Sequence, residues 1–322
     1  MEDNPKITTI MPMPGSQRRN LLLFFTGSSI IKFVLFFADM KFNLALAQIN
    51  TRLGNLPANL EKHLAVTRQA VQDGMDLLVF PELSLTGYVL QDLVPAVCCQ
   101  PNSSDPIFKL LIEASRDIDL VVGFVDEDSR HRFFIASAYL SQKKVLHVHH
   151  KVYLPTYGLF DEGRFIAHGD SVRAFDTRFG RFGMLICEDF WHVSPPYILW
   201  QDGADLLLFV SAEPGRGLNG GVKLESSAWV ESIDRAYASL FTVFVAHANR
   251  CGFEDGINFF GGSTVFDPNG KLVAQAPYYE EALIKTEIDL DLLRSTRTRL
   301  PLLRDERPDL LVRELDRILH GH

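Results

Sequence analysis

Three short runs rich in strand-forming residues, each ending in a chemically reactive side chain, place the strongest constraint on how this chain folds. Residues 77–81 lead into Glu82, residues 145–150 lead into Lys151, and residues 183–186 lead into Cys187. Such runs predict short β-strands, and open α/β folds gather their chemistry at the C-terminal edges of such strands. A carboxylate, an ammonium and a thiol presented in this way would form a nucleophilic site with its own base and its own cationic stabiliser.

From residue 41 onward the pattern predicts alternating strands and helices. The helix expected over residues 223–240 has Trp229, Ile233, Ala236, Tyr237 and Leu240 at spacings that predict a core-facing stripe. The whole pattern indicates one domain of mixed sheets covered by helices. The other expected helices are 58–73, 105–115 and 195–202, and the expected strands are 42–49, 76–80, 120–125, 133–141, 145–149, 181–186, 205–210, 241–246, 263–266, 272–276 and 282–288.

Composition limits the class of protein. With 322 residues, of which 47% are hydrophobic, the chain can bury the core of one large α/β domain. The net charge is −8 and no dense Lys/Arg run occurs, which argues against a nucleic-acid partner. The four cysteines show no CxxC spacing, so neither a disulfide framework nor a structural zinc site is indicated. A thiol nucleophile suits a reducing compartment, and we expect a cytoplasmic protein.

The first 39 residues differ from the rest. Residues 21–37 are strongly apolar and follow the pair Arg18-Arg19, as in an export signal of the twin-arginine type or a membrane anchor. The run is short for a bilayer span and contains Lys32. Because Met40 directly precedes the first expected strand, we expect residues 1–39 to be an extension from an upstream start codon, outside the fold. A domain would then cover residues 40–288, and a basic tail, residues 289–322, would pack on it or on a partner subunit.

The segments around the three reactive residues resemble the carbon–nitrogen hydrolase (nitrilase) superfamily, and especially the glutaminase domain of glutamine-dependent NAD synthetases. The matching stretches are residues 80–88 (FPELSLTGY), 151–165 (KVYLPTYGLFDEGRF) and 187–191 (CEDFW). The resemblance implies an α/β fold of four layers, α-β-β-α, with two stacked sheets and two helices outside each. It also implies a homodimer or a higher even-numbered oligomer. The Ser-Gly-Gly-x-Asp-Ser loop of the synthetase domain does not occur in this sequence, so synthetase activity is not implied.

Chemistry assigns a role to each of the three residues. Cys187 would attack an amide carbon and form a thioester. Glu82 would carry the thiol proton to the departing ammonia and later activate a water molecule. Lys151 would stabilise the thiolate and the oxyanion, with help from a backbone N–H just after Cys187. The resemblance adds Glu162, which would hold the lysine and help position the substrate; otherwise Glu162 is a solvated loop carboxylate.

Other residues are candidates for substrate binding. The resemblance places Tyr157, Glu188 and Trp191 at the substrate, and the Glu188 carboxylate beside the nucleophile could pair with the α-ammonium of an amino acid. The alternatives are structural ion pairing for Glu188 and core packing for the two aromatic residues. Ser211 and Arg216 lie in a glycine-rich loop after an expected strand, where substrate contacts are common. Histidines 147, 149 and 150 have no cysteine partners at metal-ligand spacing, and we expect no metal there.

The sequence therefore predicts an amidohydrolase that needs no cofactor or metal and cleaves a small amide to acid and ammonia. Glutamine or a related ω-amide is the favoured substrate. The alternatives are an N-carbamoyl amidase or a nitrilase on another substrate, a glutaminase subunit that supplies ammonia to a separate synthetase, and an inactive scaffold.

Overall fold

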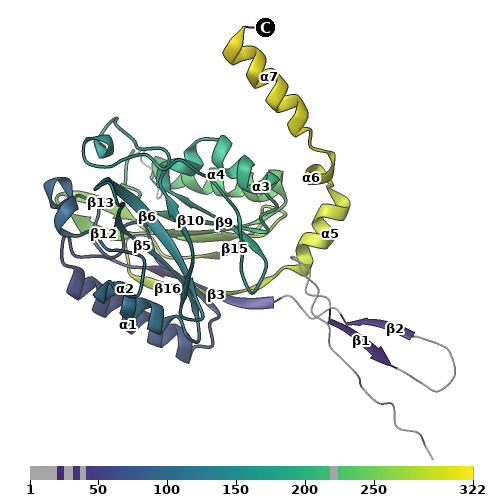
Figure 1. Cartoon of the computed structure of the whole chain (residues 1–322), viewed down its shortest axis with the longest axis horizontal. Helices are drawn as coiled ribbons and strands as arrows, with labels where there is room; N and C mark the ends of the chain where they lie inside the picture. Colours follow the sequence, from purple (N-terminus) through teal and green to yellow (C-terminus); the bar gives the residue numbers. More distant parts are fainter. Residues whose placement is uncertain (1–19, 25–31, 37–40, 218–223, 322) are drawn as a thin grey trace, which may run out of the picture.

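The computed structural model describes residues 20–24, 32–36, 41–217 and 224–321. Two six-stranded mixed sheets form its centre (Figure 1), ordered β16-β3-β4-β5-β6-β7 and β15-β14-β11-β10-β9-β8. The inner strands β3–β4–β5 and β9–β10–β11 are parallel, and the outer strands are antiparallel to their neighbours. The bounds are β3 (Lys41–Gln48), β4 (Leu77–Val79), β5 (Asp119–Glu127), β6 (Phe133–Ser141), β7 (Lys144–His150), β8 (Phe175–Asp176), β9 (Arg181–Ile186), β10 (Leu206–Ser211), β11 (Phe244–Asn249), β14 (Thr264–Phe266), β15 (Leu272–Gln275) and β16 (Ala282–Asp289).

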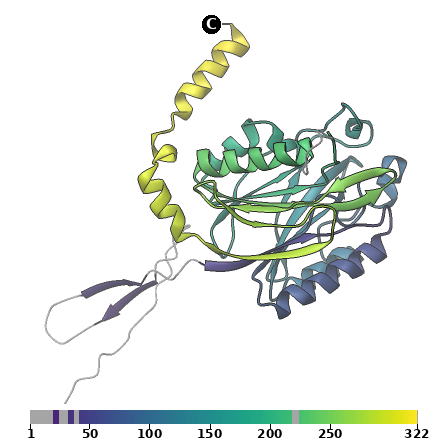
Figure 2. The same cartoon turned by 180° about the vertical axis from the view of Figure 1, so that it is seen from behind.

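Four helices cover the outer faces of the two sheets. Helices α1 (Leu56–Gln72) and α2 (Pro106–Ala114) lie on one side, and α3 (Ser194–Gln201) and α4 (Glu225–Phe241) lie on the other (Figures 1 and 2). Side-chain alternation along the strands separates the core into layers. In β10, Leu206 and Leu208 pack between the sheets, whereas Leu207 and Phe209 pack towards the α3 and α4 layer. The expected four-layer sandwich is confirmed.

The expected inner stripe of α4 is wrong in part. Trp229 and Leu240 are 56% and 60% exposed, whereas Val230, Asp234 and Phe241 are buried. The inner face is displaced because a charged residue belongs to it: Asp234 accepts hydrogen bonds from partners on the sheet beneath the helix. A stripe chosen by apolar residues alone is therefore rotated away from the buried face, which it shares only in part, at Tyr237.

Some elements were not expected from the sequence. The hairpin of β12 (Cys251–Glu254) and β13 (Ile257–Phe260) follows β11. The C-terminal tail folds into α5 (Asp291–Arg299), α6 (Leu302–Asp305) and α7 (Pro308–His320). Helix α5 is attached to the domain through Arg297, whose guanidinium lies 2.8 Å from the Asp205 carboxylate. Helix α7 projects away from the sandwich in both views (Figures 1 and 2).

Part of the apolar N-terminal run lies in a second hairpin. Strand β1 (Asn20–Phe24) pairs antiparallel with β2 (Lys32–Phe36), and in the described part of the chain neither pairs with a strand of the large sheets. The remainder of residues 1–39 lies outside the described residues, so the expectation of an extension outside the fold stays a prediction. No helix among the described residues is long and apolar enough to cross a membrane.

Candidate active site

Cys187 stands at the end of β9 in a strained backbone conformation. Its φ is +48°, in the left-handed region that non-glycine residues adopt at a cost of about 1–3 kcal/mol. It begins a short 3-10 helix, η3 (Cys187–Trp191). The Asp189 carboxylate holds this turn: it accepts the N–H of Ile186 at 3.1 Å and lies 2.8 Å from the His149 ring.

The same Asp189 carboxylate connects the cysteine turn to the segment that follows Lys151. Its Oδ1 accepts the backbone N–H groups of Val152 and Tyr153, each at 2.9 Å. Sequence reasoning assigned no role to Asp189. A carboxylate two positions after the cysteine could have drawn attention, but its partners become visible only when β7 and β9 lie close together.

Glu82 follows β4 in a turn that depends on a glycine in the neighbouring strand. Leu83, directly after Glu82, has a φ of +48°. A Cβ at Gly123 of β5 would lie 2.4 Å from the Pro81 carbonyl oxygen and 2.5 Å from the Leu83 nitrogen. These distances are too short for any side chain, so this turn requires glycine at position 123.

Lys151 lies between two carboxylates and is fully buried. Its Nζ is 2.8 Å from Glu82 Oε1 and 2.8 Å from Glu162 Oε1. Glu82 Oε2 accepts the Ala212 N–H at 2.9 Å, and the Tyr88 hydroxyl donates to Glu162 Oε1 at 2.6 Å. Glu162 therefore forms a close ion pair with the lysine, and its carboxylate is buried rather than solvated.

Burial and charge together set the protonation of this cluster. Burial opposes the charge of Lys151, but Glu162 and Glu82 hold the pKa of Lys151 well above its usual range. Burial raises the pKa of Glu162 to about 7, although Lys151 acts in the opposite direction. Burial and the nearby Glu213 and Glu82 raise the pKa of the Cys187 thiol, and Lys151 lowers it in part.

The Cys187 thiol donates a hydrogen bond to Glu213, a residue to which the sequence analysis gave no role. Cys187 Sγ lies 3.6 Å from Glu213 Oε1, and the Trp191 indole N–H donates to the same oxygen at 3.2 Å. Glu213 follows β10, just as Glu82 follows β4 and Cys187 follows β9. The rule that selected the other residues could therefore have identified it.

A cavity of about 100 Å³ opens beside the thiol. The Tyr157 hydroxyl donates to both oxygens of Glu188, at 3.1 and 2.9 Å. The Arg216 guanidinium lies over the Phe160 ring at 4.7 Å from its centre, and its Nη2 is buried without a hydrogen-bond partner. The lining residues are Tyr157, Phe160, Cys187, Glu188, Trp191, Glu213, Pro214, Arg216 and Ser226.

Ser211, the remaining candidate, is not in that lining. It is fully buried at the end of β10, and its hydroxyl lies 2.9 Å from His247 Nε2. His247 Nδ1 in turn lies 2.9 Å from Asp234 of α4. This chain of contacts fastens the end of β10, and with it Ala212 and Glu213, to the helix outside the sheet.

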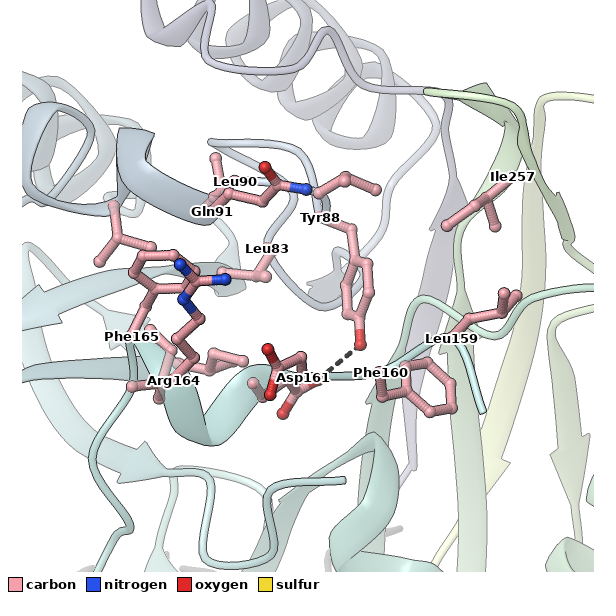
Figure 3. Close-up of a pocket in the computed structure, with 15 residues that line it drawn as sticks. Leu83, Tyr88, Leu90, Gln91, Leu159, Phe160, Asp161, Arg164, Phe165 and Ile257 are labelled. Carbon is pink, nitrogen blue, oxygen red and sulfur yellow. Dashed lines mark hydrogen bonds between the residues drawn. The ribbon is translucent and has the colours of Figure 1, made fainter. Parts of the chain in front are cut away.

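A second cavity, of about 200 Å³, adjoins Glu162 (Figure 3). Most of its lining is apolar, and Leu83, Leu90 and Phe165 belong to it. Phe160 lines both cavities. Figure 3 shows the Tyr88 hydroxyl and its hydrogen bond at the wall of this cavity.

Two of the three strand histidines, His149 and His150, pair with carboxylates. His149 lies 2.8 Å from Asp189, and His150 lies 2.7 Å from Asp126. Burial lowers the pKa of His147 to about 4. Among the residues that the structure describes, no group of three or more His, Cys, Asp or Glu side chains is arranged to hold a metal ion.

The fold and these strand-end residues define a class of protein. Residues 43–298 match the carbon-nitrogen hydrolase family, and the chain belongs to it. It is a hydrolase that acts on carbon–nitrogen bonds. The chain is 32% identical over 268 residues to the glutamine-dependent NAD(+) synthetase of Aquifex aeolicus, with 81% of this chain and 44% of that protein covered.

Two solved structures illustrate the relationship. The glutamine-dependent NAD+ synthetase of Acinetobacter baumannii superposes with a TM-score of 0.69 at 30% identity, covering 79% of this chain and 46% of that one. An amidase from Nesterenkonia sp. superposes with a TM-score of 0.70 at 25% identity, covering 84% and 95%. This chain thus spans less than half the length of the synthetases it matches, and nearly the whole of the amidase.

Proposed function

We propose that this protein is a cysteine-dependent amidohydrolase that cleaves a small amide to a carboxylic acid and ammonia. The observation that carries the proposal is the buried Lys151 ammonium, 2.8 Å from both Glu82 and Glu162, at the strand edge that also carries Cys187. A buried lysine between two acids is held ionised, as a stabiliser of negative charge must be.

The chemistry proceeds through a thioester. The Cys187 thiol passes its proton to Glu82 as sulfur attacks the amide carbon, and the carbonyl electron pair moves to oxygen next to Lys151. When the oxyanion collapses, the C–N bond breaks and the nitrogen takes up the proton and leaves as ammonia. A water molecule, deprotonated by Glu82, then attacks the thioester, and the acid and the free thiol are released. Glu162 keeps Lys151 in place throughout.

For the substrate we propose glutamine or a related ω-amide, in a protein of the cytoplasm. Glu188, oriented by the Tyr157 hydroxyl, is suited to an ammonium group, and Arg216 is suited to a carboxylate. Several relatives carry "glutamine-dependent" in their names, which supports the same substrate. An N-carbamoyl amide or a nitrile would use the same Cys187 chemistry with different cavity contacts, and ammonia could also pass to a separate synthetase.

Ammonia release from a panel of amides, N-carbamoyl compounds and nitriles tests the proposal. Wild-type protein should release ammonia from at least one amide. The Cys187→Ala and Cys187→Ser variants should lose kcat by on the order of 10³ or more while keeping the same melting temperature, because the thiol acts chemically. A serine variant that kept a tenth of the wild-type rate would exclude the thioester route.

A further inference from the structure

Glu213 is a buried acid with no lysine or arginine partner among the residues that the structure describes. Its Oε1 accepts hydrogen bonds from the Cys187 thiol and the Trp191 indole, both neutral groups. Its backbone N–H donates to Asn249 Oδ1 at 3.0 Å, which fixes the residue after β10. Within the described part of the chain, no lysine or arginine forms an ion pair with this carboxyl, and Oε2 has no hydrogen-bond partner.

The other two buried acids near the thiol, in contrast, have a cationic partner. Glu82 and Glu162 both pair with Lys151 at 2.8 Å. Buried charges in proteins are normally paired, because an isolated ion loses its hydration without compensation. Burial raises the pKa of Glu213, and the imidazole of His247 offsets this only in part. Among the described residues, Glu213 thus lacks the cationic partner that Glu82 and Glu162 share.

A positively charged ligand group has room to bind next to Glu213. Glu213 and Cys187 line the same cavity of about 100 Å³, together with Glu188. Glu188 already has a donor in the Tyr157 hydroxyl, whereas Glu213 Oε2 has none. A ligand that enters this cavity to reach Cys187 must pass beside the unpaired carboxyl.

We propose that Glu213 binds a positively charged amino group of the substrate, so that the enzyme selects small amides that carry an ammonium near the amide group. The amide chemistry in this statement depends on the proposed function; the cation preference of the cavity does not. A substrate ammonium would complete the pairing of Glu213. It would also offset the negative charge that raises the pKa of the Cys187 thiol, so the correct substrate would help to form the thiolate. N-carbamoyl amino acids, whose nitrogen is acylated and neutral, would be poor substrates.

Matched pairs of substrates test this selectivity. Glutamine is compared with N-acetylglutamine, and 5-aminovaleramide with valeramide. In wild-type protein the ammonium compound of each pair should have the higher kcat/KM. The Glu213→Gln variant should lose roughly 10- to 100-fold more in kcat/KM for the ammonium compounds than for their neutral partners, the usual loss for a hydrogen bond to a charged group. Glu287→Gln, at an exposed carboxylate on β16, is the matched control and should behave as wild type.

A second measurement does not depend on amide turnover. Cys187 is labelled with aminoethyl, hydroxyethyl and sulfonatoethyl methanethiosulfonate, which are cationic, neutral and anionic, and labelling is followed by mass spectrometry of the Cys187 peptide. Wild-type protein should react fastest with the cationic reagent. Glu213→Gln should lose that preference, and Glu213→Asp, which keeps the charge, should retain its direction.

The outcomes separate the two proposals. If wild-type protein shows the cationic preference in labelling but hydrolyses no amide, the proposed function fails and the cation site remains. Equal labelling rates with the three reagents in wild-type protein would overturn the cation site, whatever the amidase activity. So would an equal loss of kcat/KM on neutral and ammonium amides in Glu213→Gln, because Glu213 would then act in the chemistry or in folding rather than in selection.

Discussion

We expect both stability and activity to depend strongly on Lys151. It is the one positive charge between two buried acids, Glu82 and Glu162. Lys151→Met should reduce kcat nearly as much as loss of the thiol, because groups that act as a unit are not additive. It should also destabilise the fold by about 3–5 kcal/mol, since two buried carboxylates lose their counter-ion. Ammonia release and urea unfolding measure the two effects, and unchanged stability would mean that the acids become protonated without cost.

Glu162 should make the stability of the protein depend on pH. Its pKa is raised from about 4.5 in an unfolded chain to about 7 here. Between these values the folded state binds one proton more than the unfolded state, so the stabilisation is complete below about pH 4.5 and is lost as the pH rises to 7. In Glu162→Gln this contribution to the slope, about 1.4 kcal/mol per pH unit, should disappear. Urea unfolding at several pH values in this window, for wild type and variant, tests it; parallel curves would contradict the raised pKa.

At the residue scale, the sequence allowed prediction of those site residues that directly follow the end of a strand. Glu82, Lys151 and Cys187 each follow an apolar run, and they lie at one edge of the sandwich. Asp189 could not be predicted in the same way, because its partners Val152 and Tyr153 are distant in the sequence. Ser211 has the expected location at a strand end, but its hydroxyl is directed to His247. Such orientations depend on side-chain packing that local sequence does not encode.

At the scale of elements, periodicity predicted which segments form strands and helices better than which faces are buried. The four covering helices and the strands of both sheets, with the exception of β8, were expected near their observed bounds. The α4 stripe was misplaced because Asp234, a charged residue, is on the inner face, where His247 and Thr264 satisfy it. When a buried polar network satisfies a charged residue in this way, the rule that charged residues lie on the exposed face of a helix fails.

Strand β5 controls the Glu82 turn through Gly123. A methyl group at this position would meet the Pro81 carbonyl and the Leu83 nitrogen at less than contact distance. Gly123→Ala should therefore displace Glu82 from Lys151, lowering kcat while leaving Cys187 in place, and should destabilise the protein by about 1–3 kcal/mol, as overpacking does. Activity and melting temperature measure the effect. Gly256→Ala, at a glycine with open space around it and a positive φ that Gly123 lacks, shows the effect of backbone strain without overpacking.

On the scale of the whole molecule, helices α4 and α7 are among the elements that leave large apolar side chains exposed. Helix α7 exposes Leu315, Ile318 and Leu319, and α4 exposes Trp229 and Leu240. Burying such a side chain contributes about 1.5–3 kcal/mol, so a second subunit that covered these faces would be strongly stabilised. We predict a homodimer or a higher even-numbered oligomer. Light scattering at micromolar concentration should give at least twice the chain mass, and the Leu315→Asp/Ile318→Asp variant should reduce it if α7 takes part. A monomer mass for wild type contradicts the prediction.

The N-terminal boundary can be tested on the same scale. Strand β3, which begins at Lys41, pairs along its full length with β16 on one side and through residues 44–46 with β4 on the other. It therefore has no open edge for a further strand, and β1 and β2 pair with each other. A chain that begins at Met40 should keep full activity and an unchanged melting temperature. An apolar segment that belonged to the core would instead lower stability when removed, since several Leu and Phe side chains at about 1.5–3 kcal/mol each would lose their burial.

Aggregation or loss of activity in the shortened protein, with full-length protein unaffected, would place residues 1–39 within the fold. Partition of the full-length protein into cell membranes would instead indicate an anchor or an export signal, without changing the assignment of the active site.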